Sequence, residues 1–322
     1  MPTTPEAAIA AAEQARRNIA GIAIRTPLVR LNTDGIRNTE HAEPEIYLKL
    51  ESLQPIGSFK LRGAANVMAK TAADRLARGV LTASAGNMAQ GVAYCARQRG
   101  VPATVISPET APETKMRAVE RLGGRIIKVP FDQWWKTFED RAFPGVDATF
   151  IHAFDDADVM AGNGTIALEL IEDLPEIDAV VIPWGGGGLA CGIAAVMKAL
   201  KPSVRVYAAE VETGAPLSAS LAAGKPVVVE HRSSFVDGIA SKTVFPSMLK
   251  LAQELIDGAI VVKLEEIAAA IKFVAERNRV IAEGAAGCAV AAALSGRAGS
   301  GKVVAIVSGG NIDMKKLAEF VG

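Results

Sequence analysis

The chain has 322 residues, of which 50% are hydrophobic and 22% charged, as is typical of a soluble α/β protein. Its 35 basic and 35 acidic side chains balance, so no overall field attracts nucleic acid or an anionic membrane, and a small-molecule partner is expected. The three cysteines, Cys95, Cys191 and Cys288, lack metal-site spacing and are an odd number, which argues against a disulfide framework and favours a reducing cytoplasm.

Short apolar runs alternate with helical patterns along the chain. The runs of strand length are 46–50, 80–83, 103–106, 126–129, 179–182, 204–208 and 303–307. A first helix is expected to begin after Thr4, which reads as a helix cap. Further helical patterns cover 115–122, 159–174, 189–200, 264–277 and 285–294. This alternation predicts an α/β fold with open, mostly parallel sheets and helices on both faces. Because ligands of such sheets bind at the carboxyl ends of the strands, functional residues are expected in the loops that follow them.

A lysine stands in an apolar setting shortly after the run 46–50, in the segment Gly-Ser-Phe-Lys-Leu-Arg-Gly-Ala of residues 57–64. A partly buried lysine loses its charge more readily, and its free amine can form an imine with an aldehyde. Lysines are mostly exposed surface residues, so Lys60 taken alone is not a site. The role of Lys60 can be inferred only together with the other loops.

A second loop, Ser-Ala-Gly-Asn-Met-Ala-Gln-Gly of residues 84–91, follows the run 80–83 and begins a helix. Its backbone donors could hold a carboxylate, and an ordinary helix cap is the alternative. The last loop, Ser-Gly-Gly-Asn of residues 308–311, places one hydroxyl at a strand end, where a simple turn is the alternative.

The third loop is rich in glycine and reads Pro-Trp-Gly-Gly-Gly-Gly-Leu over residues 183–189 at the start of a helix. Several backbone N–H groups can converge there on a phosphate without side chains in the way. Gly185, Gly187 and Ala190 also match the dinucleotide fingerprint G-x-G-x-x-A, and Glu210 follows as a candidate ribose ligand. This loop alone does not separate a dinucleotide from another phosphate-bearing cofactor.

Taken in order, the four loops resemble those of the fold-type II pyridoxal-phosphate (PLP) enzymes, within them the serine and threonine dehydratase branch that includes serine racemase. The match spans nearly the whole chain and includes Phe-Asp-Asp at 154–156 and Gly-Asn-Gly-Thr at 162–165. The resemblance implies a tryptophan synthase β-like fold, with a large PLP-binding domain of residues 1–60 and 149–322 and a small inserted α/β domain of residues 61–148. It also implies a homodimer and the short, catalytic-only form of the family, and it argues against the dinucleotide alternative.

The resemblance assigns roles to single residues. Lys60 would carry PLP as a Schiff base and remove the α-proton of the substrate, Phe59 would pack near the ring, and Asn87 would bind its 3′-oxygen. Ser308 would face the pyridine nitrogen. The phosphate would be held by Gly185, Gly186, Gly187, Gly188 and Leu189, and the substrate carboxylate by Ser84, Ala85, Gly86, Asn87 and Met88. Glu210 and the Gly214 carbonyl would contribute to a divalent-cation site, although Pro216 stands where some relatives have an acid.

The implied reaction converts a β-hydroxy amino acid of the L-threonine or L-serine type into a 2-oxo acid and ammonia. Ser308 offers a protonated ring nitrogen no charge partner, which favours loss of the β-substituent. Ala85 stands where racemising relatives have a second serine, and it has no proton to transfer, which argues against a racemase. Met88 replaces a histidine of many relatives and suggests a bulkier substrate such as phenylserine, unless its side chain points into the protein. Dehydration of 3-hydroxyaspartate and a non-catalytic PLP protein are further alternatives.

Other residues near these loops have simpler explanations. Asp155, Asp156 and Glu283 are acidic candidates for the site, but helix caps or helix-start charges explain them equally well. His152 matches no motif and is expected to be structural or exposed. The neighbouring tryptophans at 134 and 135 are expected to pack or to cover an interface.

Overall fold

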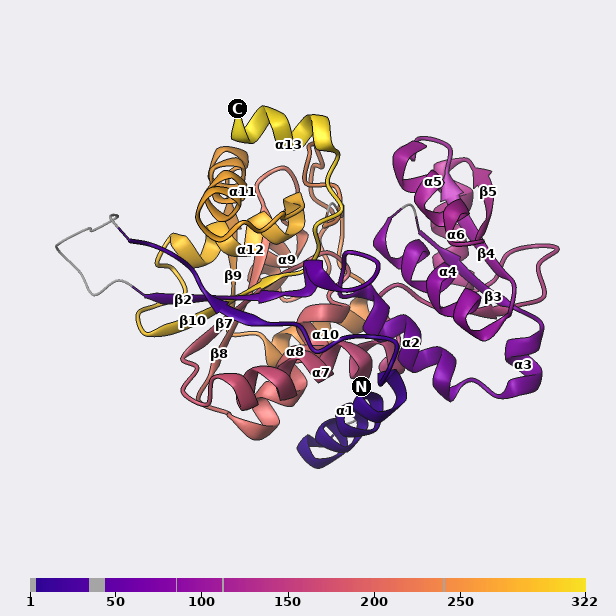
Figure 1. Ribbon diagram of the computed structural model, residues 1–322, viewed down its shortest axis with the longest axis horizontal. Coiled ribbons are helices and arrows are strands. Elements are labelled where there is room, and N and C mark those ends of the chain that lie inside the picture. Colours follow the sequence, from indigo (N-terminus) through magenta and orange to yellow (C-terminus); the bar gives the residue numbers. More distant parts are fainter. Residues whose placement is uncertain (1–3, 35–43, 85, 112, 240) are drawn as a thin grey trace.

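Two open sheets form the framework of the computed structural model, which describes residues 4–34, 44–84, 86–111, 113–239 and 241–322 (Figure 1). The larger sheet has the order β1 (Leu28–Arg30), β2 (Glu45–Leu50), β10 (Lys302–Val307), β7 (Ala179–Pro183), β8 (Arg205–Val211) and β9 (Gly258–Val262). The smaller sheet has the order β5 (Arg125–Val129), β4 (Ala103–Pro108), β3 (Val80–Ala83) and β6 (Thr149–Phe150). Only β1 runs antiparallel to its neighbour among these paired strands. The predicted α/β fold with mostly parallel sheets is confirmed.

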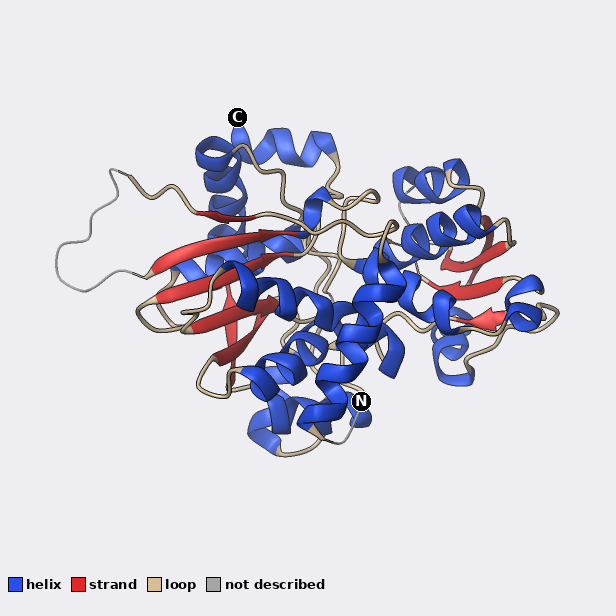
Figure 2. Cartoon of the chain, turned by 60° about the horizontal axis from the view of Figure 1, so that its bottom comes forward, coloured by secondary structure: helices blue, strands red, loops and turns tan. Residues whose placement is uncertain are grey.

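Helices connect the strands and cover both faces of the larger sheet (Figure 2). In chain order the helical segments are α1 (Pro5–Ile19), the 3-10 turn η1 (Glu51–Leu53), α2 (Lys60–Lys70), α3 (Ala73–Ala77), α4 (Asn87–Arg99), α5 (Glu113–Arg121), α6 (Phe131–Asp140), α7 (Ala157–Asp173), α8 (Gly188–Leu200), α9 (Pro216–Ala223), α10 (Pro246–Leu255), α11 (Leu264–Asn278), α12 (Gly284–Leu294) and α13 (Met314–Val321). Thr4 begins α1 as expected, because its hydroxyl accepts a hydrogen bond from the Ala7 N–H at 3.3 Å. None of the helices within the described residues is both long and apolar enough to cross a membrane.

The central strands are apolar on both sides because each side faces a core. Val303, Ala305 and Val307 of β10 belong to the core that includes α11 and α12, whereas Val304 and Ile306 belong to the core of α7, α8 and α10. Successive strand residues point to opposite faces, so a strand buried on both faces reads as a continuous apolar run. Cys288 and Cys191 are free thiols buried in these two cores, and Cys95 is a free thiol buried in the core of the smaller sheet.

The smaller sheet is built from residues that lie between β2 and β7 of the larger sheet. Its edge strand β6 pairs with β3 and ends at Phe150, two residues beyond the expected boundary at 148. Helix α2 packs against both α4 and α7 and so touches elements of both sheets. The division into domains at residues 61 and 148 stays a prediction.

Candidate active site

A cavity of about 440 Å³ lies between elements of the two sheets, and all four predicted loops contribute to its lining. Loops after β2, β3, β7 and β10 reach it, as expected for the carboxyl ends of parallel strands. Of the predicted site residues, those on the lining are Phe59, Lys60, Ser84, Gly86, Asn87, Met88, Gly185, Gly186, Gly187, Gly188, Leu189 and Ser308. Ala85 lies outside the described residues. Glu210 and Gly214 do not line the cavity.

Lys60 is placed by a tight turn that pairs with the last loop. Gly57 has φ +72°, and a Cβ there would lie 2.6 Å from the Asn311 Oδ1, so this position favours glycine. The Phe59 N–H donates to the Ser308 carbonyl at 3.0 Å, and the Gly310 N–H donates to the Gly57 carbonyl at 2.9 Å. The turn therefore fixes the start of α2, and with it Lys60, beside Ser308.

The Lys60 amine is perturbed by its surroundings. Its Nζ donates to the Ala153 carbonyl at 2.5 Å and lies 5.1 Å from the centroid of the Phe59 ring. Burial lowers the pKa of Lys60 to about 8, and the nearby charge of Glu283 opposes this shift. A larger fraction of the amine is thus uncharged at neutral pH than in an ordinary lysine, as nucleophilic attack on an aldehyde requires.

The glycine loop opens helix α8 and leaves backbone donors free. Gly187 has φ +88°, and a Cβ on Gly186 would lie 2.2 Å from the Phe154 ring, so these positions require glycine. The N–H groups of residues 185–189 make no hydrogen bond to any other residue that the structure describes. Unpaired N–H groups at a helix N-terminus attract an anion, which fits the predicted phosphate site.

The loop after β3 is tied to the opposite side of the cavity through Asn87. The Asn87 Nδ2 donates to both carboxylate oxygens of Glu283, at 2.8 and 3.1 Å, and its Oδ1 accepts from the Asn311 Nδ2 at 2.8 Å. The Ser84 hydroxyl accepts from the Gly86 N–H at 3.2 Å. Met88 is 2% exposed and packs in the hydrophobic core of the smaller sheet, so its side chain points mainly into protein.

Two further residues complete the polar part of the cavity. Ser308 is 1% exposed and lines the cavity. Glu283 lines the cavity, and burial raises its pKa to about 7 against the opposing effect of the Asn87 hydrogen bond. Glu283 is the N-cap residue of α12, as the helix-start explanation requires, but its carboxylate accepts from Asn87 across the cavity and makes no capping hydrogen bond. The sequence signal for Glu283 was only its place just before a helix.

The other acidic candidates have structural roles. Asp156 caps α7 by accepting hydrogen bonds from the Asp158 and Val159 N–H groups, and Asp155 pairs with Arg141 at 3.1 Å. Both oxygens of Glu210 accept backbone N–H groups at the start of α9, at 2.8 and 2.7 Å, and burial raises the pKa of Glu210 to about 7. The described residues contain no cluster of three or more His, Cys, Asp or Glu side chains suited to a metal.

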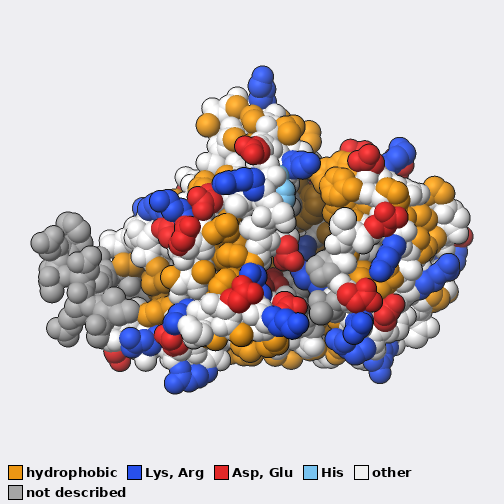
Figure 3. Space-filling view, turned by 90° about the horizontal axis from the view of Figure 1, so that it is seen from above, with side chains coloured by type: hydrophobic (Ala, Val, Ile, Leu, Met, Phe, Trp, Pro, Cys, Tyr) orange, Lys and Arg blue, Asp and Glu red, His pale blue; other side chains and the backbone are white. Residues whose placement is uncertain are grey.

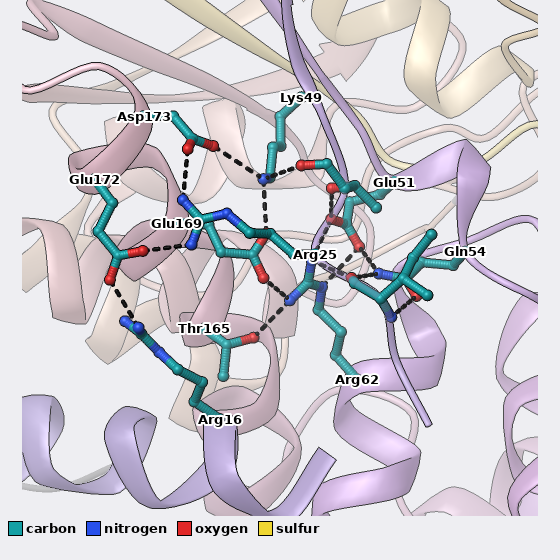
Figure 4. Close-up of polar contacts among 12 residues, drawn as sticks. Arg16, Arg25, Lys49, Glu51, Gln54, Arg62, Thr165, Glu169, Glu172 and Asp173 are labelled. Carbon is teal, nitrogen blue, oxygen red and sulfur yellow. Dashed lines mark hydrogen bonds and ion pairs between the residues drawn. The ribbon is translucent and has the colours of Figure 1, made fainter. Parts of the chain in front are cut away.

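A buried ion cluster that the sequence analysis missed is centred on Arg62, two residues after Lys60 on α2 (Figure 4). The Arg62 guanidinium binds Glu51 at 2.8 Å and Glu169 at 2.6 Å, and Lys49 binds Glu169 at 2.6 Å. Burial would raise the pKa of Glu51, but Arg62 holds it below its usual value. The cluster joins α2 to η1 and α7, and thereby anchors the first turn of the helix that carries Lys60.

The chain is similar in sequence and in structure to known proteins. Residues 19–309 match the family described as pyridoxal-phosphate dependent enzymes, and the chain belongs to that family. It is 40% identical over 312 residues to the L-threonine ammonia-lyase of Thermotoga maritima, a match that covers 96% of this chain and 77% of the relative. A tomato (Solanum lycopersicum) threonine deaminase structure has a TM-score of 0.86 at 33% identity, covering 99% of this chain and 94% of that one. Maize serine racemase has a TM-score of 0.86 at 31% identity, covering 97% and 95%.

The cavity fits the cofactor of this family. PLP carries an aldehyde and a phosphate, and the cavity combines a lysine amine of lowered pKa with the unpaired N–H groups that begin α8. Ser308 borders the same cavity. Basic and acidic side chains are interspersed on the face shown in Figure 3.

Proposed function

We propose that this protein is a PLP-dependent ammonia-lyase that converts a β-hydroxy amino acid of the L-threonine or L-serine type into a 2-oxo acid and ammonia. The observation that carries the proposal is the pairing, in one cavity, of the Lys60 amine with the free donors of the glycine loop. The relative from Thermotoga maritima, named an L-threonine ammonia-lyase, supports the reaction class.

Each predicted site residue has a task in this reaction. Bound PLP would withdraw electrons from the α-carbon of the substrate. Lys60 would hold the cofactor and then take the α-proton at its Nζ, while backbone donors of residues 84–88 would orient the substrate carboxylate. Asn87 would bind the 3′-oxygen, and Ser308 would face the ring nitrogen without adding a charge. The β-hydroxyl leaves as water with one proton, and a water then adds at the α-carbon and displaces ammonia, so the net products are the 2-oxo acid and ammonia.

The absorption spectrum of the purified protein with added PLP, together with 2-oxo acid formation from L-threonine and L-serine, tests this proposal. The matched variants are Lys60→Ala and Lys70→Ala, because Lys70 lies on the same helix with an exposed side chain. After unbound PLP has been removed, we expect visible absorption by protein-bound cofactor, together with turnover, in the wild type and in Lys70→Ala, and neither in Lys60→Ala. An absence of cofactor absorption in the wild type would overturn the proposal.

Three finer features belong to the same proposal. The family resemblance supports a homodimer, which sedimentation would test, and the free thiols support a cytoplasmic location, which fractionation of the producing cells would test. A divalent cation would need Glu210 to release its two backbone donors and the Gly214 carbonyl to join it. Loss of activity on chelation, restored by Mg²⁺, would support that site.

A further inference from the structure

One side of the cavity is aromatic, and we call Trp134, Trp135, Phe138, Phe154 and Phe245 the aromatic wall. The rings form a continuous series, with centroids 5.0 Å apart for Trp134 and Phe138, 6.1 Å for Phe138 and Phe154, 5.1 Å for Phe154 and Phe245, and 5.7 Å for Phe245 and Trp135. They come from α6, from the loop after β6 and from the segment before α10. Phe154 follows Ala153, whose carbonyl binds Lys60, so the wall begins beside the reactive amine.

Trp135 borders the cavity from outside the four hydrophobic cores formed by the described residues. Its Nε1 donates to Glu139 at 3.0 Å, and its ring meets Phe245 edge to face. The ring also contacts Phe131, Trp134 and Phe138 of its own helix, so it is held in a fixed orientation at the cavity, as a binding surface requires.

The charges on the lining exclude an acidic side chain on the substrate. The charged residues there are Lys60, Lys115, Asp237 and Glu283. Lys115 is bound to Asp237 at 2.5 Å, and Lys60 is committed to the cofactor in the proposed function. No cation on the described lining is left for a second carboxylate, so 3-hydroxyaspartate would bring a buried, unpaired charge.

We propose that the aromatic wall receives the β-substituent, and that the substrate class is β-hydroxy amino acids with an aromatic or large apolar β-substituent, such as L-threo-phenylserine. This inference rests on the proposed function and names its substrate. A phenyl ring meets the rings of the wall edge to face or offset-stacked, whereas the methyl group of threonine leaves most of that surface uncovered. The products from phenylserine are phenylpyruvate and ammonia, after loss and re-entry of one water.

The test compares kcat/KM for L-threo-phenylserine and L-threonine in the wild type, Trp135→Ala and Lys136→Ala. Lys136 is the matched control because it lies on the same helix, has a 69% exposed side chain and does not line the cavity. We expect the wild type to prefer phenylserine by about tenfold or more, since one methylene-sized difference is worth roughly 10- to 200-fold. Trp135→Ala should lose about tenfold or more on phenylserine and less than about threefold on threonine, and Lys136→Ala should retain the preference.

Binding calorimetry with L-phenylalanine and L-alanine, which carry no β-hydroxyl group, separates recognition from chemistry. We expect L-phenylalanine to bind the wild-type holoenzyme about tenfold more tightly than L-alanine, and Trp135→Ala to lose this difference. Turnover of threonine with a preference over phenylserine, or equal losses on both substrates in Trp135→Ala, would overturn the inference and leave the proposed function intact. Turnover of none of phenylserine, L-threonine and L-serine would overturn the proposed function, and equal binding of L-phenylalanine and L-alanine would then overturn the inference as well.

Discussion

The side-chain amide of Asn87 donates to both carboxylate oxygens of Glu283, at 2.8 and 3.1 Å, and so joins the first residue of α4 to the segment before α12. The two residues are 196 positions apart in the chain and come from elements around different sheets. An ionised Glu283 can accept both contacts, whereas a protonated carboxyl group keeps one oxygen that is itself a donor. The protonation state of Glu283 therefore controls how firmly Asn87 is held in the cavity.

Glu283→Gln should flatten the pH dependence of activity near neutrality. Burial raises the pKa of Glu283 to about 7, so ionised Glu283 becomes the main form only above that pH. We expect kcat/KM of the wild type to rise roughly tenfold between pH 6 and pH 8, following the ionised fraction of such a group. The variant carries a neutral amide at every pH and should lack this rise. A rise of equal size in Glu283→Gln would assign the titration to another group.

Arg62→Met should be strongly destabilising. The change leaves the buried carboxylates of Glu51 and Glu169 without their guanidinium partner, which costs about 3–5 kcal/mol. Arg78→Met is the control, because the Arg78 and Asp147 side chains are exposed, and an exposed pair contributes no more than about 1 kcal/mol. Urea unfolding of both variants at pH 7.5 measures the difference. Similar losses in the two variants would contradict this account of the cluster.

His152 should make the protein less stable in acid. Its Nδ1 accepts the Phe154 and Asp155 N–H groups at 3.2 and 2.8 Å, and burial lowers its pKa to about 3. A histidine whose pKa is lower in the folded state gives its full stabilisation above its ordinary pKa of about 6.5, and loses it as the pH falls toward the folded value. The free energy of unfolding should therefore fall from pH 7 to pH 5 by up to about 2 kcal/mol more in the wild type than in His152→Asn.

The wild type must be compared with His152→Asn because Glu283 has the opposite effect on how stability changes with pH. Its raised pKa makes the folded state bind the proton more tightly, so its contribution to stability increases as the pH falls from 7. Both proteins retain Glu283, and its effect cancels in the difference. Urea unfolding at pH 5, 6 and 7 gives the required values. Parallel curves for the two proteins would show that His152 does not titrate as stated.

Gly192→Ala should separate helices α7 and α8. A Cβ on Gly192 would lie 2.4 Å from the Met160 carbonyl oxygen, which is backbone and cannot rotate away. We expect a loss of about 2 kcal/mol or more, together with weaker PLP binding, because α8 carries the glycine loop at its N-terminus. In Gly258→Ala the nearest atoms are Tyr207 ring carbons at 3.5 Å, so a loss below about 1 kcal/mol is expected. Thermal unfolding and PLP titration distinguish the two variants.

The central strands of both sheets were predictable because burial on both faces makes them continuous apolar runs. The predicted runs at 80–83 and 303–307 fall within β3 and β10. The strands that the pattern missed, β1, β6 and β9, all lie at sheet edges. An edge strand is short or partly exposed, so its residues do not stand out from a loop.

The sequence by itself determined the α/β fold, the family and the loops that line the cavity. Each of these loops follows a strand or opens a helix, and strands and helices leave a pattern in neighbouring residues of the sequence. Only the tertiary structure decided which distant side chains complete the site. Glu283 meets Asn87, and Trp135 meets Phe245, across separations that carry no periodic signal. The tertiary structure also placed Met88 in the core of the smaller sheet and the Glu210 carboxylate at the start of α9. The physical reason is that contacts between remote segments depend on how the two sheets pack, which no local pattern specifies.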